Sequence, residues 1–323
     1  MKSFPHFQFC LLLAISFTNT MAQTSSDFET VNITTNTLVA LSFIDGNKGW
    51  AADDAGVLRY TANAGESWST IATGNNFLKL DFIDDLNGFA LTAEAAYKTT
   101  NGGNLWSQLT MPGSVGTTLY FFDSNSGFIS GEEVIYKTAN GGESWSTIST
   151  EGVSFVDFYF TSTTTGVAAA YDDQYQSLWR TTNGGVSWTN VFSQEKIYFN
   201  TVWFSDETTG FAAGYYSNAG RGKLPVIYRS ADGGLTWKKV YRNNDPGNLK
   251  GQELIDIRFK NELEGIALAT YSENAITHDG GLTWSLTYND EEDIIPSCGI
   301  YKTLGGVHDL FIAGKNGYVT KWE

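Results

Sequence analysis

The sequence predicts an all-β fold, a seven-bladed β-propeller whose last blade is closed by the N-terminal strand. Two recurring phrases predict it: an eight-residue phrase occurs six times, and a phrase from a Phe to a Gly precedes each copy. The chain of 323 residues is rich in Gly (34) and Trp (10), and shows no long helical periodicity after residue 22. A fixed-period repeat marked by Gly and aromatic residues is typical of radially repeated β-architectures.

The eight-residue phrase, called the octapeptide below, has the physical properties of a tight turn. Its third residue is Asn or Asp, whose side chain bonds to nearby backbone amides, and its fifth is Gly, which tolerates positive φ. Its last residue is a Trp that offers a large apolar surface. We therefore expect a turn from the third to the fourth strand of a blade in each copy. The copies are Thr61–Trp68, Thr99–Trp106, Thr138–Trp145, Thr181–Trp188, Ser230–Trp237 and Thr277–Trp284.

The Phe-to-Gly phrase joins an apolar, β-branched run to a short run such as FAAG or IALA. These runs are the expected first and second strands of a blade, so six full blades are predicted. The phrases are Phe43–Gly49, Phe82–Gly88, Phe121–Gly127, Phe160–Gly166, Phe204–Gly210 and Phe259–Gly265.

A seventh blade is incomplete at the C-terminus. Three strands are expected there, at Cys298–Tyr301, Leu310–Gly314 and Gly317–Trp322. The missing fourth strand is expected at the other end of the chain, where Phe28–Ile33 precedes the first blade. Pairing of this segment with the last strand would close the ring and remove two open sheet edges.

The octapeptide pattern S/T-x-D/N-x-G-x-S/T-W resembles the Asp-box, or bacterial neuraminidase repeat. With the preceding strands GVLRYT, VIYKT and VIYRS, the chain resembles the photosystem II stability/assembly factor-like family of propellers. The resemblance covers nearly all of the chain after residue 22 and implies the fold. It leaves the function open, because sialidases, xyloglucan-degrading glycosidases and sortilin-type receptors share the repeat.

The same resemblance implies an Arg-rich docking patch, which this sequence does not display. It has only six Arg, and three of them (Arg59, Arg180 and Arg229) are interpreted as sharing one third-strand position with Lys98 and Lys137. We expect these five side chains to be architectural. A photosynthetic role is therefore not carried over, and only an exported propeller that holds another molecule remains.

Residues 1–22 are interpreted as a signal peptide and residues 23–323 as one propeller domain. Lys2 precedes an apolar run, and Thr20-Met21-Ala22 provides a cleavage site, so a secreted or periplasmic protein is expected. An uncleaved N-terminal anchor is the alternative; after cleavage no stable membrane insertion is expected. The net charge of −15 disfavours nucleic acid as a partner. We expect a monomer.

Loop lengths point to one face of the ring. The octapeptide and the Phe-to-Gly phrase never change length, whereas the second-to-third and fourth-to-first connections are longer in blades 4–6 and at the entry to blade 7. The longer connections are predicted to be loops at Tyr171–Ser177, Gly214–Pro225, Tyr241–Glu253 and Tyr288–Ser297. Long loops on a rigid scaffold commonly carry function, and Tyr with charged groups suits recognition of a protein or a glycan of the cell envelope or medium. The candidate ligand-binding residues are Tyr171, Asp172, Asp173, Tyr175, Tyr215, Tyr216, Arg221, Tyr241, Arg242, Asp245, Glu273, Tyr288, Asp290, Glu291, Glu292 and Asp293.

No catalytic residue, metal site or cofactor is predicted. The acidic run Asp290–Asp293 lacks the ligand spacing of a calcium loop, and the two His and one Cys after residue 22 form no zinc pattern. A glycoside hydrolase is the alternative, with Asp172 or Asp173 facing Glu253 or Glu273 as a carboxylate pair. The arginine signature of sialidases is absent, so a non-enzymatic binding module is favoured.

Charged residues also fall on the expected innermost strands. Lys79, Asp81, Asp157, Asp256 and Arg258 are predicted to border the central channel as ion pairs. A ligand held in the channel is the alternative to this structural role.

Overall fold

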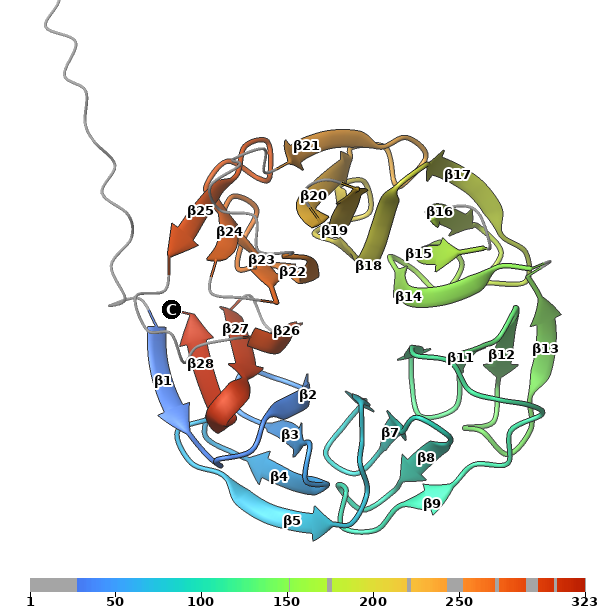
Figure 1. The fold of residues 1–323 in the computed structure, drawn as a ribbon. Helices are drawn as coiled ribbons and strands as arrows, with labels where there is room; N and C mark the ends of the chain where they lie inside the picture. The colour runs from blue at the N-terminus through green and yellow to red at the C-terminus, as the bar shows by residue number, and fades with distance from the viewer. Residues whose placement is uncertain are drawn as a thin grey trace, which may run out of the picture.

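Seven four-stranded antiparallel sheets stand in a ring around a central axis (Figure 1). The computed structural model describes residues 28–150, 152–172, 176–219, 222–242, 252–270, 273–288, 296–304 and 307–322. In each blade the first strand lies innermost and the fourth outermost. The predicted seven-bladed all-β propeller is confirmed. No helix in these ranges is both long and apolar enough to cross a membrane.

The first four blades follow the chain in order. Blade 1 contains β2 (Leu38–Phe43), β3 (Gly49–Asp53), β4 (Val57–Thr61) and β5 (Ser69–Thr73). Blade 2 contains β6 (Lys79–Phe82), β7 (Gly88–Leu91), β8 (Ala96–Thr99) and β9 (Ser107–Gln108). Blade 3 contains β10 (Leu119–Phe121), β11 (Gly127–Gly131), β12 (Val134–Thr138) and β13 (Ser146–Ser149). Blade 4 contains β14 (Ser154–Phe160), β15 (Gly166–Tyr171), β16 (Gln176–Thr181) and β17 (Thr189–Gln194).

The other three blades include the longest strands. Blade 5 contains β18 (Ile197–Phe204), β19 (Gly210–Asn218), β20 (Gly222–Ser230) and β21 (Lys238–Arg242). Blade 6 contains β22 (Leu254–Phe259), β23 (Gly265–Ala269), β24 (Glu273–Thr277) and β25 (Ser285–Tyr288). Blade 7 contains β26 (Pro296–Leu304), β27 (Val307–Gly314), the short 3-10 turn η2 (Lys315–Gly317) and β28 (Tyr318–Trp322).

The two ends of the chain close the ring. Strand β1 (Phe28–Asn32) pairs antiparallel with β28, with Phe28 opposite Trp322 and Asn32 opposite Tyr318 (Figure 1). Blade 7 therefore has the order β1-β28-β27-β26. The predicted closure is confirmed, and it removes two sheet edges from solvent.

The octapeptide forms the predicted turn through its own side chains. In blade 3, the Gly142 amide donates to Thr138 Oγ1 at 2.9 Å, and the Ser144 amide donates to Asn140 Oδ1 at 3.0 Å. Gly142 has a φ of +88°, a conformation that L side chains rarely adopt. The other five copies repeat both bonds, with Leu105 as the amide donor in blade 2. The predicted roles of Asn or Asp and of Gly are thus confirmed.

The Phe-to-Gly phrase explains how blades pack. Its Phe and Gly are direct register partners, as in Phe82 opposite Gly88, and the ring covers the glycine so closely that an added Cβ would lie 2.7 Å from it. The same ring stacks on an aromatic residue of the preceding blade: Phe82 lies 3.7 Å from Trp50, and Phe121 lies 3.5 Å from Phe89, between ring centroids. Aromatic pairs of this kind add to the stability gained by burial. The phrase therefore marks the interface between blades.

Lys and Arg side chains on the third strands form hydrogen bonds to the next blade. Lys98, Lys137, Arg180 and Arg229 each donate to the carbonyl of the fourth octapeptide residue of the following blade, as in Arg180 Nε to the Gly233 oxygen at 2.8 Å. The expectation that these four side chains are architectural is supported. Arg59 does not share their position, and that part of the interpretation was wrong. It stands two residues before the octapeptide Thr rather than next to it, and a shift of one residue turns a strand side chain to the opposite face.

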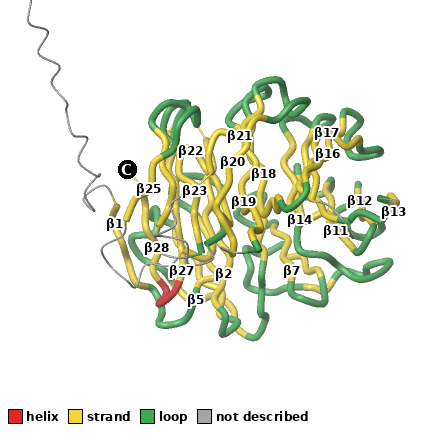
Figure 2. Tube along the Cα trace, turned by 45° about the horizontal axis from the view of Figure 1, so that its top comes forward, coloured by secondary structure: helices red, strands yellow, loops and turns green. Residues whose placement is uncertain are grey.

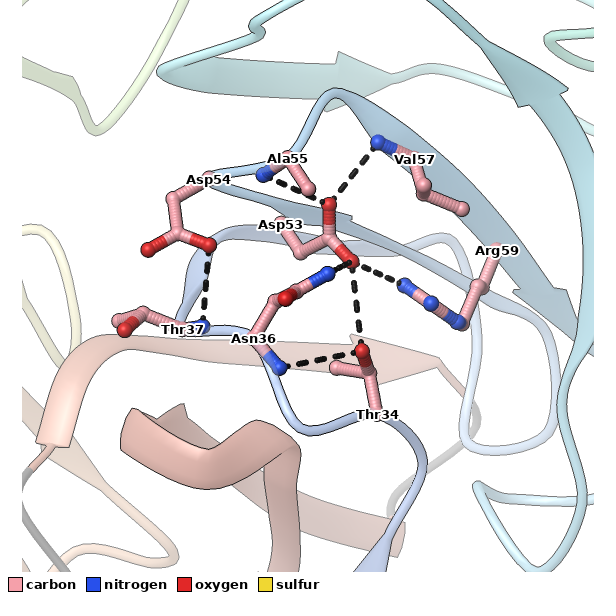
Figure 3. A network of polar contacts seen from close by, with 8 residues as sticks. All are labelled: Thr34, Asn36, Thr37, Asp53, Asp54, Ala55, Val57 and Arg59. Carbon is pink, nitrogen blue, oxygen red and sulfur yellow. Dashed lines mark hydrogen bonds and ion pairs between the residues drawn. The ribbon is translucent and has the colours of Figure 1, made fainter.

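Arg59 instead belongs to a polar network beside the closure (Figure 3). Its Nη1 lies 2.8 Å from Oδ2 of the fully buried Asp53, which also accepts from Asn36 Nδ2 at 3.1 Å and from Thr34 Oγ1 at 3.5 Å. Asn36 and Thr34 lie between β1 and β2, so the network ties the N-terminal linker to blade 1. Burial raises the pKa of the Asp53 carboxyl, but the bonds from Arg59, Asn36 and the Val57 amide lower it below its ordinary value.

Candidate functional site

The two sides of the ring differ in their connections. In a four-stranded up-and-down blade, the first-to-second and third-to-fourth turns lie on one side, here called the octapeptide face. The second-to-third and fourth-to-first connections lie on the other side, here called the loop face. Figure 2 shows loops bordering the strands on both sides of the ring. The predicted residues that lie in described strands are toward the loop-face ends of those strands: Tyr171, Tyr215, Tyr216, Tyr241, Arg242, Glu273 and Tyr288.

The most extended feature of the loop face is a hairpin in blade 5. The segment Gly214–Pro225 was expected to be a loop, but β19 continues to Asn218 and β20 begins at Gly222, with pairing from Gly210 to Asn218. The physical reason is burial: every residue from Leu224 to Tyr228 is buried, so this part of the segment belongs to the packed sheet rather than to a surface loop. Because successive residues of a strand point to opposite sides, Tyr215 and Tyr216 lie on opposite faces of this blade 5 hairpin.

Tyr215 is part of a stack on the side that faces blade 6. Its ring lies parallel to that of Tyr198, with centroids 4.7 Å apart, and Lys223 Nζ lies 4.5 Å from the Tyr215 centroid. Lys223 Nζ also forms an ion pair of 2.8 Å with Glu253 Oε2. Burial raises the pKa of the Tyr215 phenol, opposed by the charge of Lys223, so the hydroxyl is neutral near pH 7. The stack brings two aromatic rings and both signs of charge together.

Tyr216 forms a second stack on the side that faces blade 4. The Arg242 guanidinium lies 4.0 Å from the Tyr216 centroid, which is within the range of a cation–π interaction. Tyr216 also packs against the core between blades 4 and 5, where Tyr228 donates its hydroxyl to Gln194 Oε1 at 2.9 Å. Blade 5 thus presents one aromatic–cation pair on each face, with Lys223 from the hairpin and Arg242 from β21.

The structure places the other predicted residues less closely together. Tyr171 ends β15 and is 44% exposed, and Asp172 follows it. Tyr241 packs partly against the core between blades 5 and 6. Glu273 and Tyr288 are register partners in blade 6, and only the backbone of these two residues is described. Outside the described residues lie Asp173, Tyr175, Arg221, Asp245, Asp290, Glu291, Glu292 and Asp293.

Sequence reasoning missed Tyr198, Lys223 and Asn200 as members of the blade 5 cluster. Asn200 Nδ2 lies 3.5 Å from Glu253 Oε2, the same oxygen that pairs with Lys223, and donates to the Leu254 carbonyl at 2.8 Å. The sequence suggests Glu253 only as one member of a hydrolytic carboxylate pair, whereas in the structure it forms an ion pair with Lys223. The alternation of buried Ile197 and Phe199 with half-buried Tyr198 and Asn200 was a signal that could have revealed this surface.

The charged residues of the innermost strands join blades to one another. Asp81 Oδ2 accepts from the Phe121 amide of blade 3, and Asp157 Oδ2 accepts from the Val202 amide of blade 5, both at 2.9 Å. Asp256 pairs with Arg258 of its own strand. Burial raises the pKa of Asp256, and the positive charges of Arg258 and Lys79 oppose the shift. The predicted ion pairing is thus seen for Asp256 with Arg258, whereas Asp81 and Asp157 accept from backbone amides of the following blade.

No clustering of three or more His, Cys, Asp or Glu that could hold a metal ion occurs among the described residues.

The comparisons with known proteins then bear on the fold. No family model and no curated protein matches the chain. Solved structures do match the chain. YCF48 bound to a D1 peptide is 18% identical in sequence; the match covers 93% of this chain and 98% of the YCF48 chain, with a TM-score of 0.70. YCF48 from Cyanidioschyzon merolae is 19% identical over 92% and 98%, also with a TM-score of 0.70.

An ancestral GH74 enzyme is more distant. It is 14% identical, with a TM-score of 0.62, and the match covers 88% of this chain but only 44% of the enzyme. At these identities the likeness shows a shared propeller fold. It leaves the function to be argued from the residues of the site.

Proposed function

We propose that this protein is an exported, non-enzymatic binding propeller that holds a segment of a protein partner on the loop face of blades 4–6. The observation that carries the proposal is the blade 5 hairpin, with Tyr215 and Lys223 on one face and Tyr216 and Arg242 on the other. Tyr and Arg are the residues most enriched among the energetically dominant positions of protein interfaces.

The geometry of the hairpin favours a protein segment as the ligand. Its Tyr rings are already held by their stacking partners, so little side-chain entropy is lost when a ligand covers them. The neutral Tyr215 hydroxyl can donate to a peptide carbonyl, while Lys223 and Arg242 supply positive charge beside apolar rings. The solved complex of YCF48 with a D1 peptide lends support from a protein of the same fold.

The test compares three proteins on immobilised supports: the wild type, a Tyr215→Ala/Tyr216→Ala double variant, and Leu105→Asn as a control on the octapeptide face. Each is exposed to solubilised envelope proteins of the source organism and, separately, to a glycan array. We expect a protein that the wild type and the control retain equally and that the double variant binds about tenfold more weakly, as for two interface hot spots. Thermal melting verifies that the variants are folded.

Two results would contradict the proposal. Retention of glycans without any protein would make the loop face a carbohydrate site. Hydrolysis of aryl glycosides that a Glu253→Gln variant abolishes would establish the glycoside hydrolase alternative instead.

A further inference from the structure

The octapeptide face carries most of the large apolar side chains that the described residues leave in solvent. Eight such side chains are exposed, and six of them lie in turns of this face, between 53% and 73% exposed. Only Leu78 and Tyr171 lie elsewhere. The six are Leu86, Leu105, Val186, Leu235, Leu263 and Leu282.

These apolar side chains are concentrated on three consecutive blades. The sixth octapeptide residue is Val186, Leu235 and Leu282 in blades 4, 5 and 6. Leu263 lies beside the last of these, because its carbonyl accepts from the Gly280 amide of the same octapeptide at 2.9 Å. Blade 2 holds the other two, Leu86 and Leu105.

The fold does not require apolar residues at these positions. The sixth octapeptide residue of blades 1, 2 and 3 is Glu66, Asn104 and Glu143, and it is exposed in all six blades. The turn bonds are the same in both sets, since they come from the first, third and fifth residues. Identical turns with polar residues in one half of the ring and apolar residues in the other indicate a surface property rather than a packing need.

The charge around these side chains is negative. The turns of blades 4–6 on this face contain six carboxylates (Asp206, Glu207, Asp232, Glu262, Glu264 and Asp279) and one lysine, Lys260. Lys137, Arg180 and Arg229 bring three further cations to the octapeptide carbonyls of these blades, so the carboxylates outnumber these cations by six to four. Burial raises the pKa of Asp206 and Asp279, but hydrogen bonds from Thr208, Thr209 and Thr283 lower it to about 2, so both are ionised at neutral pH. Such a surface repels anionic lipid and repels a second copy of itself.

We propose that the octapeptide face of blades 4–6 is a second docking surface, which takes a basic protein segment that alternates Lys or Arg with large apolar side chains. The aliphatic side chains Val186, Leu235, Leu263 and Leu282 fill the apolar contacts, and the surrounding carboxylates pair with the cations. The surface is separate from the blade 5 hairpin, so this inference stands or falls independently of the proposed function.

The test uses the full chain and a short labelled peptide of Leu and Lys. Binding to the wild type is compared with binding to a Val186→Asn/Leu235→Asn/Leu282→Asn variant, which keeps the net charge and installs the residue that blade 2 carries. Leu78→Asn is the control, because Leu78 is similarly exposed but precedes β6 on the loop face. We expect the triple variant to bind at least about tenfold more weakly and the control to bind like the wild type.

The variants also report on folding and on other occupants. The triple variant should melt within about 2 °C of the wild type, since surface substitutions away from packed features cost little. Equal affinity of wild type and triple variant, or equal binding of a peptide with Glu in place of Lys, would overturn the proposal. The proposal would also be overturned if the wild type did not bind the peptide but did bind vesicles or self-associate in sedimentation, and the triple variant lost that binding or self-association.

Discussion

Removing the Asp53 carboxylate tests whether side chains hold the ring closed in addition to β1. In the folded protein this buried group accepts from Arg59, Asn36 and Thr34 and from the Val57 amide at 2.9 Å. Two of these donors lie on the linker between β1 and β2, and Arg59 and Val57 lie on β4. The Asp53→Ala substitution therefore disconnects three segments at once (Figure 3).

The expected loss of stability follows from what is left behind. The Arg59 side chain is 12% exposed, so without Asp53 its charge remains buried and unpaired. Removing one partner of a buried ion pair typically destabilises by about 3–5 kcal/mol. Asp53→Asn keeps one oxygen that can accept from the Val57 amide, but it replaces the oxygen that accepts from Arg59, Asn36 and Thr34 with a donating NH2 group, so we expect it to restore little of the lost stability. The Asp53→Ala/Arg59→Met double variant should be more stable than Asp53→Ala alone, because it no longer leaves the Arg59 charge buried and unpaired.

Urea unfolding followed by Trp fluorescence measures these losses, since a shift of midpoint at constant slope reports a change in stability. Asp54→Asn is the matched control: Asp54 is exposed, accepts only from the Thr37 amide at 3.1 Å, and should cost less than about 1 kcal/mol. The reasoning is refuted if Asp53→Ala costs no more than Asp54→Asn, or if the double variant is less stable than Asp53→Ala alone.

Three further predictions concern stability. Deleting residues 23–33 removes β1 and should markedly lower the melting temperature; an unchanged melt would contradict side-by-side pairing with β28. Arg180→Met removes the bond to the Gly233 carbonyl and should cost about 1–2 kcal/mol in urea unfolding, whereas a neutral result would show that bond to be dispensable. Asp206 and Asp279 have folded pKa values of about 2, below the ordinary value, so they stabilise the fold above about pH 4 and this stability is lost as the pH falls toward 2. Unfolding midpoints at decreasing pH should therefore fall less in an Asp206→Asn/Asp279→Asn variant than in the wild type.

The fold could be predicted from sequence because each repeated residue performs a local task. Gly142 and its equivalents adopt positive φ, and Asn140 accepts from an amide four residues away, so eight consecutive residues determine the turn. The Phe–Gly pair is equally local, since Phe82 covers Gly88 across one tight turn. Repetition of these local rules also gave the blade count and the missing strand of blade 7.

The side-chain networks were less predictable, because they depend on register and on contacts between distant segments. Arg59 was assigned to the wrong position by one residue, which in a strand reverses the direction of the side chain. The Lys223–Glu253 pair joins residues on two blades, and its Tyr198–Tyr215 stack depends on how far the hairpin extends. Loop length alone suggested a loop at Gly214–Pro225, whereas the pairing continues through most of it.

Loop length varies on one face of the ring only, so it predicts a site there and none on the other face. The octapeptides are uniform in length, so variation in their sixth residue, from Glu66 to Leu282, carried no weight in that comparison. Blades 4–6 differ from blades 1–3 on both sides of the ring, with the extended hairpin on one side and an aliphatic sixth octapeptide residue on the other, although blade 2 also exposes Leu86 and Leu105. A scaffold residue varies freely only where no neighbour constrains it, and such positions are where a partner can select the side chain.

Both proposed surfaces lie on blades 4–6, one on each face of the ring. Either one partner contacts both faces, or two different partners bind one face each and are brought together. If one partner contacts both faces, the Tyr215→Ala/Tyr216→Ala and Val186→Asn/Leu235→Asn/Leu282→Asn variants should each weaken binding of that same protein. The losses should then exceed what either contact provides separately, because the two contacts act at high effective concentration. If two partners bind, each variant should affect one of them and leave the other unchanged. Binding of each captured protein to both variants decides between a clamp and a bridge.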